Sequence, residues 1–154
     1  MKTMLVAALA GAALSIGVAQ AAPLLPGGVT RAEVTAALAA KGLPAALKAD
    51  GAGEQLIATK VGDTPFVIIF YGCKAQRCQS VMFKTAYHFD GGVSAATIND
   101  WNRNKRFIRA WLDPDQDPNA VMDVDFEKGA TSEAIASNLE TWLGILPLFR
   151  QHFQ

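Results

Sequence analysis

A run of six apolar residues in the middle of the chain, Phe66 to Tyr71, constrains the fold more than any other feature. The run reads FVIIFY, so β-branched and aromatic side chains dominate it. Short continuous runs of this kind are typical of a central strand that is buried on both faces of its sheet. The sequence therefore predicts a sheet with residues 66–71 near its centre.

Other segments of the chain supply the strands next to this one. Residues 55–60 are predicted to form a strand, and residues 45–49 a short strand at the sheet edge. In the segment 81–89, Val81, Phe83, Tyr87 and Phe89 alternate with Met82, Lys84, Ala86 and His88. A period of two predicts a strand with one face inward and one face outward.

Three helices are predicted from their capping residues and apolar stripes. Thr30 and Glu33 form a capping box that starts a helix running to Lys41. Ser94 caps a helix over residues 95–104, which places Ile98 and Trp101 inward. The last helix starts after Thr131 or Ser132 and is expected to kink or end at Pro147. Its apolar stripe consists of Ile135, Leu139, Trp142, Leu143 and Leu146.

Residues 106–112 and 120–126 are predicted to pair as antiparallel strands. The register that we expect places Leu112 opposite Ala120, Ala110 opposite Met122 and Arg109 opposite Asp123. One face of this pair then carries Phe107, Arg109, Trp111, Asp123 and Asp125. Phe107, Arg109 and Trp111 are therefore candidates for a partner-binding surface, or else they are covered by the last helix.

Strands grouped between separated helices indicate an α+β domain with an antiparallel sheet. We expect the element order α-β-β-β-α-β-β-α, with residues 45–49 as an additional short edge strand. Residues 29–154 are long enough to form a single domain with its own core. Residues 22–28, which contain proline and glycine, form a lead-in to that domain.

The first 21 residues have the pattern of a secretory signal peptide. Lys2 provides a positive charge, residues 4–18 are uncharged and largely apolar, and Ala19-Gln20-Ala21 provides a cleavage motif. We expect cleavage after about Ala21 and a periplasmic or secreted product. The alternative is an uncleaved membrane anchor, because residues 4–22 approach the length that spans a bilayer.

Cys73 and Cys78 are the only two cysteines of the sequence, and four residues separate them. Across a hairpin they are expected to face each other and form a disulfide, which export favours. So short a loop predicts a modest stabilisation of about 2 kcal/mol. The alternative is a redox-active or sensing pair, because Lys74 and Arg77 would lower a thiol pKa.

Other chemistry has little support in the sequence. Asp113, Asp115 and Asp117 are candidates for a weak calcium site, but Pro118 and Val124 stand where the calcium loop of an EF-hand needs glycine and glutamate. The chain contains no G-x-S-x-G motif, and no cofactor or catalytic residue is predicted. With 14 basic and 14 acidic residues and no basic stripe, it is not expected to bind nucleic acid.

Several short motifs resemble the YbjN-domain family of bacterial sensory transduction regulators. These motifs are Phe70 to Cys73, Cys78 to Phe83, Ile98 to Asn102, Arg106-Phe107, Leu112-Asp113 and the final helix with Trp142. The resemblance covers residues 29–149. It implies a fold similar to secretion chaperones of the Tir-chaperone type, and a role in regulation and protein interaction without an established reaction.

The sequence thus leads to an exported, non-enzymatic regulatory module that binds a protein partner and forms a homodimer. No contact with membranes is expected after cleavage of the leader. Two alternatives remain open. One is a thiol-disulfide sensor that uses Cys73 and Cys78, and the other is a weak calcium or small-ligand binder that uses the Asp113–Asp125 region.

Overall fold

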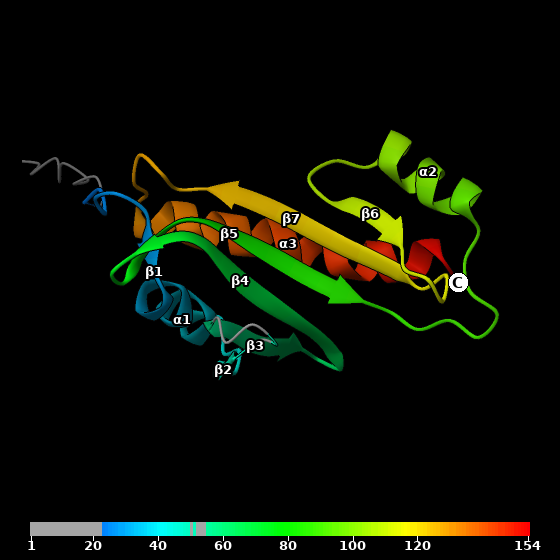
Figure 1. Ribbon diagram of the computed structural model, residues 1–154, viewed down its shortest axis with the longest axis horizontal. Helices are drawn as coiled ribbons and strands as arrows, with labels where there is room; N and C mark the ends of the chain where they lie inside the picture. The colour runs from blue at the N-terminus through cyan, green and yellow to red at the C-terminus, as the bar shows by residue number, and fades with distance from the viewer. Residues whose placement is uncertain (1–22, 50, 52–54) are drawn as a thin grey trace, which may run out of the picture.

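The computed structural model describes residues 23–49, 51 and 55–154 (Figure 1). The expected signal peptide, residues 1–21, lies outside these residues. The described chain is an α+β domain in which three helices accompany one seven-stranded antiparallel sheet. In chain order the elements are β1 (Val29–Thr30), α1 (Arg31–Ala40), β2 (Ala46–Ala49), β3 (Gln55–Val61), β4 (Thr64–Lys74), β5 (Arg77–Ala86), α2 (Ala95–Asn104), β6 (Arg109–Leu112), β7 (Pro118–Asp125) and α3 (Ser132–His152).

The strands lie in the order β2-β3-β4-β5-β7-β6, and β1 pairs with β5 beyond the end of β7. The expected central position of residues 66–71 is confirmed, because β4 has β3 on one side and β5 on the other. The additional edge strand expected at residues 45–49 is present as β2, so four strands lie between α1 and α2. β1 was not predicted, because two residues are too few for a periodic signal.

The hairpin of β4 and β5 is longer than the sequence predicts. Both strands continue past the apolar run to a tight turn at Ala75 and Gln76, where Lys74 pairs with Arg77. β5 ends at Ala86, whereas the sequence predicts a strand up to residue 89. Thr85 follows Val81 and Phe83 as the next inward side chain of this strand. The Thr85 hydroxyl donates to the carbonyl of Pro65 over 2.8 Å, which satisfies this buried polar group.

The register expected for the last two strands is wrong by two residues. Ala110 lies opposite Ala120 rather than Met122, and Arg109 lies opposite Val121 rather than Asp123. A shift of two keeps every side chain on its expected face, since strand side chains alternate. β6 also starts late, because Phe107 has a φ of 72°, a left-handed conformation that does not continue a strand.

The helix starts follow from the capping residues. The capping box of α1 is confirmed, because Thr30 accepts from the Glu33 amide while Glu33 accepts from the Thr30 amide. α2 begins after Ser94 as expected, and α3 begins after Thr131. Of the kink or end expected at Pro147, the end is wrong, because Pro147 lies inside α3. The helix continues to His152 because its final turns bury Phe149, whose ring lies 4.9 Å from that of Trp101.

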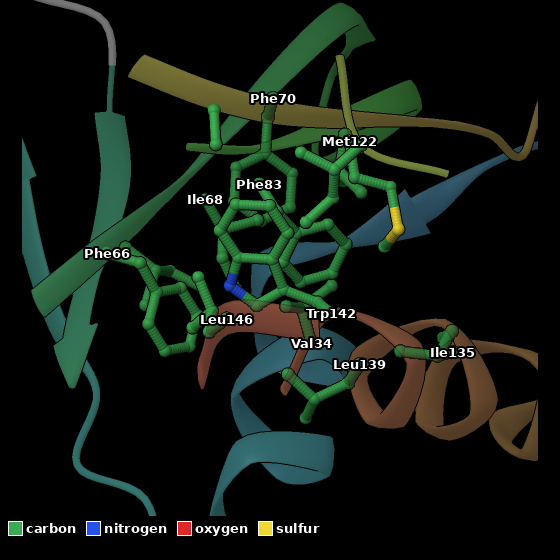
Figure 2. Close-up of a cluster of buried hydrophobic side chains, with 14 of the residues drawn as sticks. Val34, Phe66, Ile68, Phe70, Phe83, Met122, Ile135, Leu139, Trp142 and Leu146 are labelled. Atoms are coloured by element: carbon green, nitrogen blue, oxygen red, sulfur yellow. The ribbon is translucent and has the colours of Figure 1, made fainter. Parts of the chain in front are cut away.

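The core lies between one face of the sheet and the pair α1 and α3 (Figures 1 and 2). Trp142 of α3 is fully buried at its centre, with ring centroids 5.9 Å from Phe66 and 5.7 Å from Phe83. Figure 2 shows Phe70 and Ile68 above this indole, with Val34 of α1 and Leu139 of α3 on the helix side. α2 joins the core at the far end, through Trp101.

A matched pair of leucines in α3 tests this packing. Leu139→Ala is expected to lower the free energy of unfolding by about 2–5 kcal/mol, because Leu139 is 2% exposed. Leu148→Ala is the control, since Leu148 is 48% exposed, and it should change that energy by less than about 0.5 kcal/mol. Urea denaturation measures both. Equal effects of the two substitutions would contradict the described burial of α3.

Candidate interaction surface

The sheet face opposite α1 and α3 carries a second set of apolar side chains. The inward residues Ile57, Ile68 and Phe83 are buried, and their chain neighbours point to the other side of the sheet. We call this second side the open face. It comprises Lys48, Leu56, Ala58, Val67, Ile69, Met82, Lys84, Trp111, Val121 and Asp123.

No helix in the described part of the chain packs over the open face. In Figure 1 the strands lie in front of α3, and α2 stands beyond the sheet edge at β6. Leu56, Val67, Ile69 and Met82 are accordingly only half-buried, although each has apolar neighbours on adjacent strands. This differs from the sequence prediction that the run 66–71 is buried on both faces. β4 therefore has one face in contact with water, although its composition is typical of a strand that is buried on both faces.

A cationic and aromatic cluster borders the apolar part of the open face. The Trp111 ring lies 5.6 Å from the Lys84 ammonium and 5.6 Å from the Arg109 guanidinium. Arg109 also lies 3.6 Å from a carboxylate oxygen of Asp123, so this expected ion pair forms diagonally across the shifted register. Both partners are mainly exposed, so the pair contributes little to stability.

Phe107 is the most unusual residue near this cluster. Its side chain is 62% exposed and its backbone has a φ of 72°, a conformation that is costly for a bulky residue. The Arg106 guanidinium stacks 4.9 Å from its ring. The Ile108 amide donates to the Arg106 carbonyl over 2.9 Å, so Phe107 is the central residue of a tight turn. Residues with strained backbone cluster at functional sites.

Two hollows lie on or beside the open face. A shallow depression of about 510 Å³ lies over β3, β4 and β5, and its lining includes Lys48, Leu56, Val67, Ile69 and Lys84. A second depression of about 450 Å³ is lined by Asn102, Phe107, Ile108 and Arg109. The three surface residues expected from the sequence, Phe107, Arg109 and Trp111, therefore lie on or beside the open face. The aliphatic residues of β3–β5 were missed, because the sequence places them inside a covered sheet.

The two edges of the sheet differ in their protection. At the β6 edge, the Asn102 side chain donates to the Ala110 carbonyl and accepts from the Ala110 amide, with both distances 2.9 Å. This side chain thus occupies the place of a further strand. At the other edge, β2 is short and fully exposed, and carries Lys48.

Cys73 and Cys78 are joined by a disulfide across the β4–β5 hairpin. They lie opposite each other in the ladder, as expected, with a Cα–Cα distance of 3.9 Å. Cys73 is exposed, whereas Cys78 is fully buried beneath β1. Gly28 approaches the Cys78 carbonyl so closely that any side chain there would clash with it. The redox-sensor hypothesis stays a prediction.

Arg77, next to Cys78, connects this hairpin to the start of α1. Its guanidinium donates to the Gly28 carbonyl over 2.9 Å and to the Glu33 carboxylate over 3.2 Å. Glu33 is at the same time the acidic member of the capping box. One half-buried ion pair therefore fixes β1 and α1 relative to the sheet.

The acidic loop between β6 and β7 uses its oxygen atoms for internal hydrogen bonds. One Asp113 carboxylate oxygen accepts from the amides of Asp115 and Asp117, over 3.0 and 2.9 Å. Asp117 in turn accepts from the Phe89 amide and contacts His88. Within residues 23–49, 51 and 55–154, no three His, Cys, Asp or Glu residues lie together in a way that would hold a metal ion. The geometry is that of a hydrogen-bonded turn.

The fold and a match to a family model together define the class of protein. It is a small α+β domain with one sheet face under helices and one face unpartnered, and no described helix is long and apolar enough to cross a membrane. The chain belongs to the YbjN family, whose model matches residues 30–154 and carries the description "putative bacterial sensory transduction regulator". That description names a regulator and assigns no reaction. A search of curated proteins found no match.

Reduction of the disulfide tests how much this bond contributes to the free energy of unfolding. Without the bond, the free energy of unfolding is expected to fall by about 2 kcal/mol, because the unfolded chain gains the entropy of a short open loop. Urea denaturation with and without a phosphine reductant measures the difference. The control is Cys73→Ala/Cys78→Ala, whose midpoint should not respond to reductant. An unchanged midpoint in the wild type would refute this role.

The contact between His88 and Asp117 predicts a pH dependence. Nδ1 of His88 lies 2.8 Å from the Asp117 carboxylate, and this hydrogen bond raises the pKa of His88 above 6.5. The Phe89 amide and then His88 lower the pKa of Asp117 below 3.8. The contact therefore stabilises the fold most between these values. Its contribution falls as pH rises through the raised His88 pKa, and also as pH falls through the lowered Asp117 pKa.

NMR titration of the His88 ring measures this effect. Asp117→Asn should bring the His88 pKa down towards 6.5, because the substitution removes the main cause of the shift. Asp90→Asn is the matched control and should lower it less, since Asp90 contributes less to the shift. A larger effect of Asp90→Asn would show that the wrong carboxylate had been assigned.

Proposed function

We propose that this protein is an exported, non-enzymatic regulatory module that binds a protein partner through its open face. The observation that carries the proposal is the half-exposed apolar surface of β3–β5, in a strand whose composition is that of a buried one. Monomeric proteins rarely leave large contiguous apolar patches in water, and such patches mark interaction sites.

The residues that border this surface support the same function. Tryptophan, tyrosine and arginine are enriched among residues that dominate binding energy, and Trp111 and Arg109 lie together here, with Phe107 nearby. The resemblance to secretion chaperones, which bind other proteins, agrees with this reading. The regulatory description of the family is consistent with it as well.

Export is the second part of the proposal and is supported by the sequence. The first 21 residues follow the signal-peptide pattern, and the two cysteines are positioned to bond in an oxidising compartment. Intact-mass measurement on protein from the native host checks this part. A mature chain that starts near Ala22 and carries the disulfide is expected. A full-length product with two free thiols would contradict it.

Site-specific photo-crosslinking in the native host tests the binding surface. A photoreactive amino acid at Met82, on the open face, should form adducts with a partner protein. The same amino acid at Leu148, exposed on the opposite side in α3, is the matched control and should not. Adding Ile69→Asp should abolish the Met82 adducts, because a carboxylate interrupts the apolar surface. Adducts of equal yield from both positions would refute the proposal.

A further inference from the structure

We propose that the partner contributes an amphipathic helix, whose apolar stripe lies on β3–β5 of the open face and whose flanking residues are acidic. This inference rests on the proposed function and adds the chemistry of the partner. Its two components, helical form and acidic charge, follow from different observations.

The backbone of the sheet favours a helical partner over an extended one. Each of β3, β4 and β5 is hydrogen-bonded to a strand on both sides, so the open face offers no free backbone groups. An extended peptide lying there would leave its own amides and carbonyls unpaired against apolar side chains. A helix satisfies these groups internally. The opposite face of the sheet is already covered in this way, by α3.

The side-chain pattern of the open face suits the apolar stripe of such a helix. Leu56, Ile69 and Met82 are cross-strand neighbours in one row, and Ala58 and Val67 form the next row. Side chains of intermediate size in two parallel rows form a shallow depression, which is the hollow over β3–β5. Residues at i, i+3, i+4 and i+7 of a helix present a comparable stripe.

The charges around this hollow favour acidic flanks. Lys48 and Lys84 line it, and no acidic residue lines it within the part of the chain that the structure describes. Among the described residues, the carboxylates of this sheet face lie on β7. Asp123, opposite Met82, lies 3.6 Å from Arg109, and Asp125 accepts from the Glu127 amide. Complementary charges select partners and orient them, so glutamate or aspartate beside the stripe is expected.

Two synthetic helical peptides test the inference on the mature protein. They share one leucine stripe, and glutamates flank it in the first peptide while lysines flank it in the second. Fluorescence anisotropy at low and physiological salt measures binding. The acidic peptide should bind about tenfold more tightly than the basic one, with a difference that shrinks as salt rises. Lys48→Glu/Lys84→Glu should reverse the preference.

Matched variants separate the possible outcomes. Lys105→Glu/Lys128→Glu makes the same change in charge away from the open face and should leave the preference unchanged. Ile69→Asp should weaken both peptides, with circular dichroism confirming that the fold persists. Equal binding of the two peptides, or a preference that the double lysine variant does not reverse, would overturn the acidic partner.

The same assay distinguishes this inference from the proposed function. If neither peptide binds while crosslinks at Met82 persist in the host, the helical acidic partner is wrong and the interaction surface stands. If only vesicles rich in phosphatidylglycerol bind, and Ile69→Asp abolishes that binding, an anionic lipid surface replaces the helix. If peptides bind and Ile69→Asp has no effect, the assignment to the open face is overturned.

Discussion

The packing of α3 along one face of the sheet is the interaction on which the rest of the structure depends. Trp142 lies between Phe66 of β4 and Phe83 of β5, and Leu139, Leu146 and Phe149 extend the contact along the helix. Through Phe149 and Trp101 the same helix holds α2. Because one long helix supplies most of this cover, the sheet acquires a core on one side only.

The position of α1 depends on a second, smaller set of contacts. The Arg77 guanidinium donates to the carbonyl of Gly28 and to the carboxylate of Glu33. Next to Arg77 on β5, Cys78 pairs with Val29 of β1. A half-buried ion pair contributes modestly to stability, but its multiple hydrogen bonds define one geometry. The disulfide lies at this junction, so the start of the folded chain and the hairpin tip form one unit.

Because the core lies on one side of the sheet, apolar side chains of the open face are in contact with solvent. Val67 and Ile69 are residues that a sheet normally buries, and here they meet solvent beside Lys84 and Trp111. Exposed apolar area of this kind is unfavourable in water. The proposed binding function would explain why it is kept. The exposed Phe107 beside β6, with a φ of 72°, is a second unusual feature of this region.

Elements whose signals are local can be predicted from the amino-acid sequence alone. The capping residues Thr30, Ser94 and Thr131 start the three helices, and the alternating side chains place Arg109 and Trp111 on one face. Local sequence also put Cys73 opposite Cys78, because a short hairpin leaves few registers. These features depend on hydrogen bonds and steric preferences within a few residues.

Features that depend on contacts between distant residues emerge only in the folded chain. β6 pairs with β7 two residues away from the register that local alternation suggests. α3 passes Pro147 because burial of Phe149 outweighs a lost hydrogen bond. The open face is the clearest case. An apolar run predicts burial without specifying what covers it, since the hydrophobic effect has no direction, and the number of helices available to cover the sheet is a property of the whole fold.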